Sequence, residues 1–139
     1  MLSRPRNGWC ILSVSGWQDM ASYIEDVPVK LLDGVERVML DGTVVHVDLD
    51  GEDREYLLRL SPEQISVTTC YPGEEVVTRT FNLNIEDIAR ELIRDVRVCL
   101  EDWVDWPPGS ERPDFDRAAR RNMLAAYCDV IERILPLQN

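Results

Sequence analysis

The segment His46–Tyr56, HVDLDGEDREY, combines the single histidine of the chain with five acidic side chains around one glycine. Histidine and carboxylates bind divalent metal ions and act as general acids and bases. The calcium-loop pattern does not fit, because its first and twelfth positions fall on His46 and Leu57. On an extended strand, successive residues of one face lie ~7 Å apart, too far for joint coordination by His46, Asp48 and Asp50.

A β-hairpin accounts for this segment better than a metal loop does. Apolar residues alternate on both sides of it, which predicts a loop over 50–53, with Leu49 paired to Arg54 and Asp48 opposite Glu55. The hairpin tip would then form a negative patch. Three interpretations of this patch stay open: a solvated turn, a contact with a basic partner, and a metal site. The spacing of the residues favours the metal site least. The candidate partner-binding residues here are Asp48, Asp50, Glu52, Asp53 and Glu55.

A second acidic stretch surrounds the turn in WVDWPPGSERPDF. Between Glu101 and Asp116 the chain has six acidic residues and one base, Arg112. Tryptophan is enriched at binding hot spots, but an aromatic residue at a helix end more often closes the core. Both interpretations stay open, and the further candidate partner-binding residues are Trp103, Asp105 and Trp106.

Motifs for catalysis and cofactor binding are missing from the sequence. It has neither Gly-x-Ser-x-Gly nor a glycine-rich phosphate loop, so we assign no catalytic residue and no cofactor. The four cysteines are widely spaced and form no Cys-x-x-Cys, which speaks against a zinc site. We expect no bound metal and four free thiols, at Cys10, Cys70, Cys99 and Cys128.

The net charge of −11, from 26 acidic and 15 basic side chains, limits the possible partners. Such a chain repels nucleic acids and anionic lipid surfaces and attracts basic proteins. The apolar run at 9–14 is too short for a signal-peptide core, and no run is long enough to cross a membrane. We therefore expect a cytoplasmic protein that binds neither nucleic acid nor membrane.

The order of hydrophobic patterns predicts a single α+β domain over 1–139. A strand over 9–14 and a short helix over 15–28 come first. An antiparallel meander then follows, so that the sheet has five or six strands in total. Asp41-Gly42 is predicted to form one of its hairpin turns. Its strands are expected near 35–40, 43–49, 54–60, 65–71 and 74–81.

Two antiparallel helices are expected to complete the chain. The first begins after the N-cap Asn84 and extends to Trp103, and the second runs from Asp114 or Asp116 to Pro136. The apolar stripe of the second helix is expected at Ala119, Met123, Tyr127, Val130, Ile131 and Ile134.

These features favour a small protein-binding module that associates stoichiometrically with a basic protein. Toxin inhibitors (immunity proteins) and secretion chaperones have comparable size and charge, although no motif connects the chain to either group. The alternatives are a metal-assisted hydrolase that uses His46 with nearby carboxylates, and a structural or oligomerisation subunit. The sequence assigns no oligomeric state.

Overall fold

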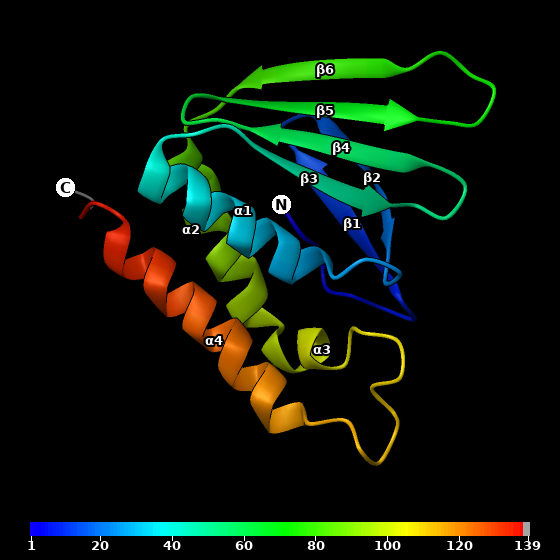
Figure 1. Ribbon diagram of the computed structural model, residues 1–139, viewed down its shortest axis with the longest axis vertical. Coiled ribbons are helices and arrows are strands. Elements are labelled where there is room, and N and C mark those ends of the chain that lie inside the picture. The colour runs from blue at the N-terminus through cyan, green and yellow to red at the C-terminus, as the bar shows by residue number, and fades with distance from the viewer. Residues whose placement is uncertain (138–139) are drawn as a thin grey trace.

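The computed structural model describes residues 1–137 and has an α+β fold, as predicted (Figure 1). Within these residues, six strands form two antiparallel sheets and four helices contribute to one connected hydrophobic core. None of these helices is long and apolar enough to cross a membrane. The elements are β1 (Trp9–Val14), β2 (Trp17–Ser22), α1 (Val27–Asp41), β3 (Val45–Asp50), β4 (Glu55–Leu60), β5 (Gln64–Cys70), β6 (Val77–Asn82), α2 (Ile85–Val98), α3 (Leu100–Val104) and α4 (Arg117–Ile134).

The first two strands form a separate ribbon. The strand over 9–14 is confirmed, but the helix predicted over 15–28 is wrong, because β2 pairs with β1 through this stretch. A two-residue turn connects Val14 to Trp17, and Ser15 adopts a left-handed φ of 52° there. The pairing turns Ala21 into the core, so burial against β1 outweighs the helical spacing of the apolar residues.

The strand predicted over 35–40 is also wrong, because these residues belong to α1. Pro28 begins this helix instead of ending a preceding one, which suits a residue without an N–H donor. Gly42 ends the helix in the left-handed conformation and donates its N–H to the Val38 carbonyl. Asp41-Gly42 is therefore a helix end and not a hairpin turn. The buried stripe is Val27, Pro28, Leu31, Leu32, Gly34, Val35 and Val38.

The second sheet is a four-stranded meander in the order β3-β4-β5-β6, and it matches the last four predicted strands closely. The register of its first hairpin differs by two residues from the prediction, since Leu49 pairs with Tyr56 and Asp50 with Glu55. A shift of two keeps every side chain on its expected face. The inner face therefore buries the predicted apolar residues Val45, Val47, Leu49, Tyr56, Leu58 and Leu60.

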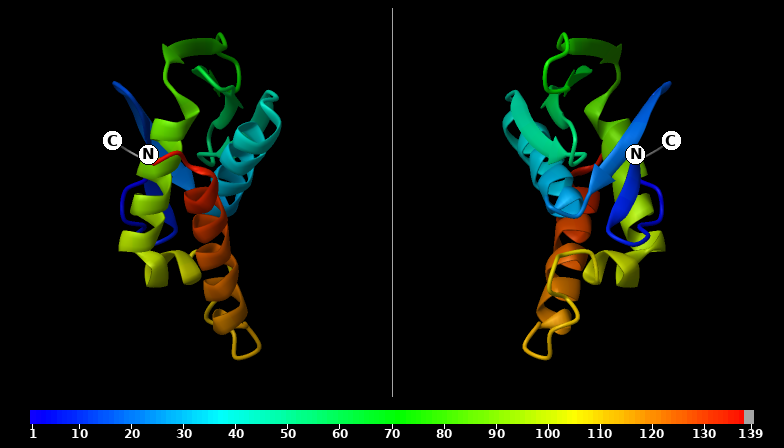
Figure 2. Two further views of the ribbon diagram at one scale, coloured as in Figure 1. Left: turned by 90° about the vertical axis from the view of Figure 1, so that its left-hand side faces the viewer. Right: turned by 90° about the vertical axis from the view of Figure 1, so that its right-hand side faces the viewer.

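Helix α1 contacts β3 and β4 of the sheet as well as α2 and α4. Gly34 allows the helix to approach the sheet closely, because a Cβ at this position would lie 2.9 Å from the Cγ2 of Val47. The outer face of the sheet stays open at His46, Asp48 and Arg59, which are exposed. Figure 2 shows β5 and β6 at the top, α4 at the bottom and the β1–β2 ribbon beside the helices in both side views.

The C-terminal helices begin where the sequence predicts. Asn84 accepts a hydrogen bond from the N–H of Glu86, and Asp116 accepts one from the N–H of Ala119. The first predicted helix is divided at Cys99 into α2 and α3. The predicted stripe of α4 is largely wrong, since the buried residues are Arg120, Leu124, Cys128 and Ile131.

Arg120 can be buried in the core because each nitrogen of its guanidinium donates a hydrogen bond. Its Nη1 and Nη2 donate to the carboxylate of Asp26 at 2.8 and 3.0 Å, and its Nε donates to the Trp103 carbonyl at 3.0 Å. Asp26 precedes α1, so this one side chain connects α4 to the start of α1 and to α3. The indole of Trp106 reinforces the same junction by donating to the Glu25 carbonyl at 3.0 Å.

We predict that Arg120→Met lowers the free energy of unfolding by about 3 kcal/mol, because the Asp26 carboxylate and the Trp103 carbonyl lose their donor. The control is Arg121→Met, which removes a neighbouring arginine whose ion pair with Glu101 is exposed to solvent and should contribute much less to stability. Urea denaturation measures both losses. Equal losses would show that the buried pair adds nothing beyond a surface pair.

All four cysteines are free thiols, and two of them are buried. Burial raises the pKa of Cys10 to about 12 and that of Cys128 to about 11. Both values lie above the unfolded value of about 8.5. The stabilisation from keeping these thiols neutral is therefore complete below about pH 8.5 and is lost as the pH rises toward the folded pKa values.

We accordingly predict two classes of thiol in the native protein at about pH 8. Cys70 and Cys99, which are partly exposed, should be alkylated by a water-soluble reagent, whereas Cys10 and Cys128 should react only after unfolding. Mass spectrometry of the labelled peptides identifies the modified residues. Labelling of Cys10 as fast as that of Cys70 would contradict the assignment.

Candidate functional site

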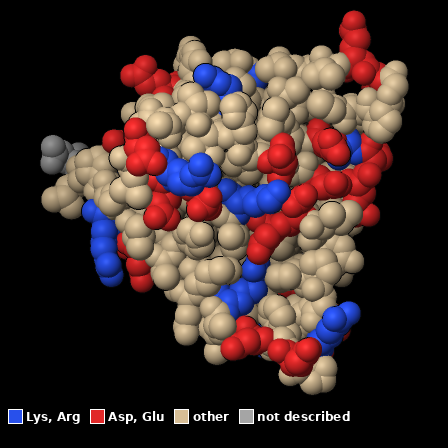
Figure 3. Space-filling model, viewed as in Figure 1, with Lys and Arg blue, Asp and Glu red and all other residues tan. Residues whose placement is uncertain are grey.

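The acidic hairpin between β3 and β4 retains uncompensated negative charge in the folded protein. Within residues 1–137, the carboxylates of Asp48, Asp50, Glu52 and Glu55 form no ion pair. Asp50 and Glu55 lie directly opposite each other in the β3–β4 register. In Figure 3 acidic side chains gather on the right of the molecule, where Figure 1 shows the tip of this hairpin.

The loop of the hairpin has a defined shape. The N–H of Gly51 donates to the Arg54 carbonyl at 2.9 Å, and the N–H of Glu52 donates to the Asp50 carboxylate. Glu52 adopts a left-handed φ of 71°. Gly51 allows a close approach of side chains, because a Cβ there would lie 2.8 Å from the hydroxyl of Tyr56. The negative charges are thus presented on a fixed turn.

Arg54 anchors this loop to both sheets. Its Nη1 lies 3.1 Å from both carboxylate oxygens of Asp19 on β2 and 3.0 Å from the hydroxyl of Tyr71. Its Nε and Nη2 donate to Asp53 at 2.6 and 2.9 Å. These hydrogen bonds hold the pKa of Asp53 below its usual range. Asp53 is therefore largely a structural partner of Arg54, which the sequence pattern did not indicate.

A shallow hollow of about 380 Å³ adjoins the acidic loop. Its walls come from the hairpin loop and from the β1–β2 ribbon, and Met20 on the ribbon is 42% exposed. The hydroxyl of Tyr56 donates to the Met20 carbonyl at 2.8 Å and fixes the ribbon beside the hairpin. Sequence reasoning missed this hollow because β2 was expected to be a helix. The lining residues are Trp9, Asp19, Met20, Gly51, Glu52, Asp53 and Arg54.

The second acidic stretch is neutralised in part by arginines of α4, which pair with its first acidic residues. Glu101 pairs with Arg121 and Arg117, and Arg117 also pairs with Asp105. The Arg121 side chain holds the pKa of Glu101 below its usual range through hydrogen bonds. The two negative charges of Glu101 and Asp105 are therefore balanced by two arginines, and Asp105 does not present a free negative charge.

The tryptophans of this stretch are part of the core. Trp103 is fully buried and Trp106 is 3% exposed, and their rings lie 5.1 Å apart between centroids. The indole nitrogen of Trp103 has no hydrogen-bond partner within the described residues. Neither ring is available on the surface, and the structure places both away from the exposed carboxylates of the hairpin.

His46 lies on the open face of the sheet, in register with Arg59 on β4. It borders a hollow of about 150 Å³ that Lys30, Asp33 and Arg37 also line. Within residues 1–137, no three histidine, cysteine or acidic side chains are close enough together to hold a metal ion. Asp48 lines the same hollow, so two carboxylates and two cationic side chains surround His46, and the cations weaken binding of a metal cation there.

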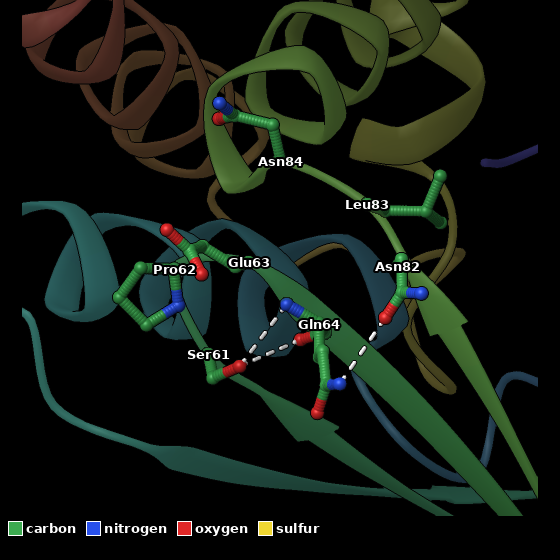
Figure 4. A pocket seen from close by; sticks show the side chains of 7 residues that line it. All are labelled: Ser61, Pro62, Glu63, Gln64, Asn82, Leu83 and Asn84. Carbon is green, nitrogen blue, oxygen red and sulfur yellow. Dashed lines mark hydrogen bonds between the residues drawn. The ribbon is translucent and has the colours of Figure 1, made fainter.

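A hollow of about 640 Å³ lies at the opposite end of the sheet (Figure 4). The Ser61 hydroxyl and the Gln64 backbone bond to each other, and the Gln64 amide donates to Asn82 at 3.1 Å. Figure 4 shows these polar groups turned toward one another. They complete a turn and a strand pair, and they do not converge on a common point.

Comparisons with known proteins do not assign the chain to a group. No protein-family model matches the sequence, and neither a curated protein nor a solved structure matches it. The functional argument therefore depends on the residues and geometry described above.

We predict that Arg54→Ala lowers the free energy of unfolding and loosens the hairpin loop, since Asp19 and Asp53 lose a charged donor. Hydrogen exchange should accelerate most in the amides of 51–53. Arg59→Ala is the matched control, because Arg59 is exposed on β4, the strand that follows Arg54, and forms no ion pair within residues 1–137. Unchanged exchange in the Arg54 variant would show that this anchor does not order the loop.

Proposed function

We propose that the protein acts by stoichiometric association with a basic protein partner and that the acidic hairpin provides the contact. The observation that carries this proposal is the set of four carboxylates without ion pairs on the fixed β3–β4 hairpin, Asp48, Asp50, Glu52 and Glu55. Unpaired charges on a fixed turn produce a local negative field that steers a basic surface toward the hairpin.

The hollow beside the hairpin supports the same contact surface. Interfaces commonly combine an apolar centre with a polar rim. Here Trp9 and Met20 provide apolar surface, and Glu52 and Asp53 lie at the edge of the same hollow. This arrangement replaces Trp103 and Trp106 as the source of an apolar anchor, because the two tryptophans are buried within the chain.

Two kinds of activity fit a small acidic binding module. It could inhibit a basic protein, or it could act as a chaperone for one. Both require a complex of fixed stoichiometry at the hairpin. They differ in the state of the partner, which is folded in an inhibited complex and incompletely folded in a chaperone complex. The expected compartment is the cytoplasm, where a partner of either kind is synthesised.

The test begins with capture of partners from a host extract on the immobilised protein, followed by binding kinetics with the purified partner. We predict that the triple variant Asp48→Asn, Glu52→Gln, Glu55→Gln lowers the association rate about tenfold at low salt, because steering by rim charges is lost. The difference should shrink as salt screens the charges. Met20→Ala should mainly raise the dissociation rate, with a cost above ~1 kcal/mol.

The matched control removes the same number of charges at the opposite end of the sheet. Asp41→Asn, Glu63→Gln and Glu86→Gln together should leave the association rate within about twofold. If both triple variants bind equally fast, overall charge rather than the hairpin governs association. If both triple variants bind the partner as fast and as tightly as the original protein does at low salt, the hairpin is only a solvated surface.

A further inference from the structure

Strand β6 forms an open edge of the four-stranded sheet. It pairs with β5 on one side, and within residues 1–137 no strand pairs with its other side. In Figure 1 and in both views of Figure 2, β6 lies at the top of the molecule with no other ribbon beyond it. The opposite edge differs, because β3 contacts β2 and α1. The backbone donors and acceptors along the outer side of β6 are thus available for another strand.

The side chains of this edge include exposed apolar groups. Val76 and Val77 are 61% and 55% exposed, which is unusual for two consecutive valines. Strand β6 contains neither proline nor glycine and has one charged residue, Arg79. Natural edge strands are commonly protected by proline, bulges or several charges, and β6 has few of these features.

The first three residues of β6 and the two residues that precede the strand form the segment Glu75-Val76-Val77-Thr78-Arg79, which is complementary to itself when two copies run antiparallel in extended conformation. Centring the pair on Val77 places Val77 opposite Val77, and Val76 opposite Thr78. The same register places Glu75 of each copy opposite Arg79 of the other. Neither charged side chain forms an ion pair within residues 1–137 of its own chain.

We propose that β6 is a self-association edge, at which a second copy of this chain pairs in antiparallel register centred on Val77. Side chains that lie directly opposite in an antiparallel pair project from the same face. Val77 faces the same side as Arg79 and Phe81, which lie opposite Val67 and Ile65 of β5. The two sheets therefore join into one continuous sheet with both helical layers on the same side.

The contact places two reciprocal ion pairs around a central pair of valines. Opposite charges and apolar side chains in directly opposed positions each stabilise a strand pair modestly. A contact of five residues from each copy belongs to the small, transient class of interfaces. The association is a weak equilibrium between monomer and dimer that the net charge of −11 on each copy opposes at low salt.

Sedimentation equilibrium at about 0.15 M salt, over about 10 µM to 1 mM protein, tests this register. We expect the unaltered chain to dimerise and Val77→Lys to raise the dissociation constant at least about tenfold, because two like charges then face each other. Leu40→Lys is the matched control. It adds the same charge at a position on α1 that is 58% exposed, and it should leave dimerisation unchanged.

Charge exchange identifies the opposed residues. Glu75→Arg and Arg79→Glu should each weaken the dimer, since positions 75 and 79 of the two copies then carry like charges opposite each other. The double variant should recover dimerisation, because both ion pairs re-form with reversed sign. An equimolar mixture of the two single variants should also recover it, because the mixed dimer has one reversed ion pair and one pair of the original sign. Circular dichroism of each variant checks that the fold is retained, which is expected for exposed positions.

Three results would overturn the proposal. The first is a monomer for the unaltered chain throughout the concentration range. The second is a dimer that Val77→Lys leaves intact, which would place the contact elsewhere. The third is a failure of both the double variant and the mixture to recover association. If the chain stays monomeric but Val77→Lys abolishes capture of a different protein, the occupant of the edge is a strand of that protein.

Discussion

The ion pair between Arg120 and Asp26 is the interaction on which the arrangement of the helices depends. A guanidinium on α4 can occupy a core position only because Asp26 and the Trp103 carbonyl accept its hydrogen bonds. These acceptors come from the start of α1 and from α3, so the pair determines how three helices meet. α1 in turn lies against β3 and β4, where Gly34 permits close approach. The position of the sheet relative to the helices follows from this junction.

The distribution of ion pairs, more than the total charge, decides where the acidity of this chain can act. Arginines on α4 neutralise Glu101 and Asp105, and Arg54 pairs with both Asp19 and Asp53 and offsets one of their two negative charges. The side chains left without such pairs on the β3–β4 hairpin stand on a turn that Arg54 itself holds in place. A single arginine therefore both removes negative charge from the loop and fixes the orientation of the charges that remain.

The two proposed contacts use different physical properties of one sheet. The β3–β4 hairpin presents charge, which acts over a distance of about the Debye length. The β6 edge presents unpaired backbone groups and two valines, which act only on contact. Because β3 and β6 are the opposite edges of the sheet, occupation of one leaves the other accessible.

Local sequence determined the elements whose signals depend on neighbouring residues. The strands from Val45 onward and the faces of their side chains followed from period-two alternation, whereas the β3–β4 register was shifted by two residues. The helix starts at Asn84 and Asp116 followed from capping side chains. Tertiary structure decided the rest. Trp17–Ser22 is a strand because β1 pairs with it, and 35–40 is helical because α1 buries its valines against β3. The burial of Arg120 and the neutralisation of Glu101 also depend on partners distant in sequence, which no local pattern specifies.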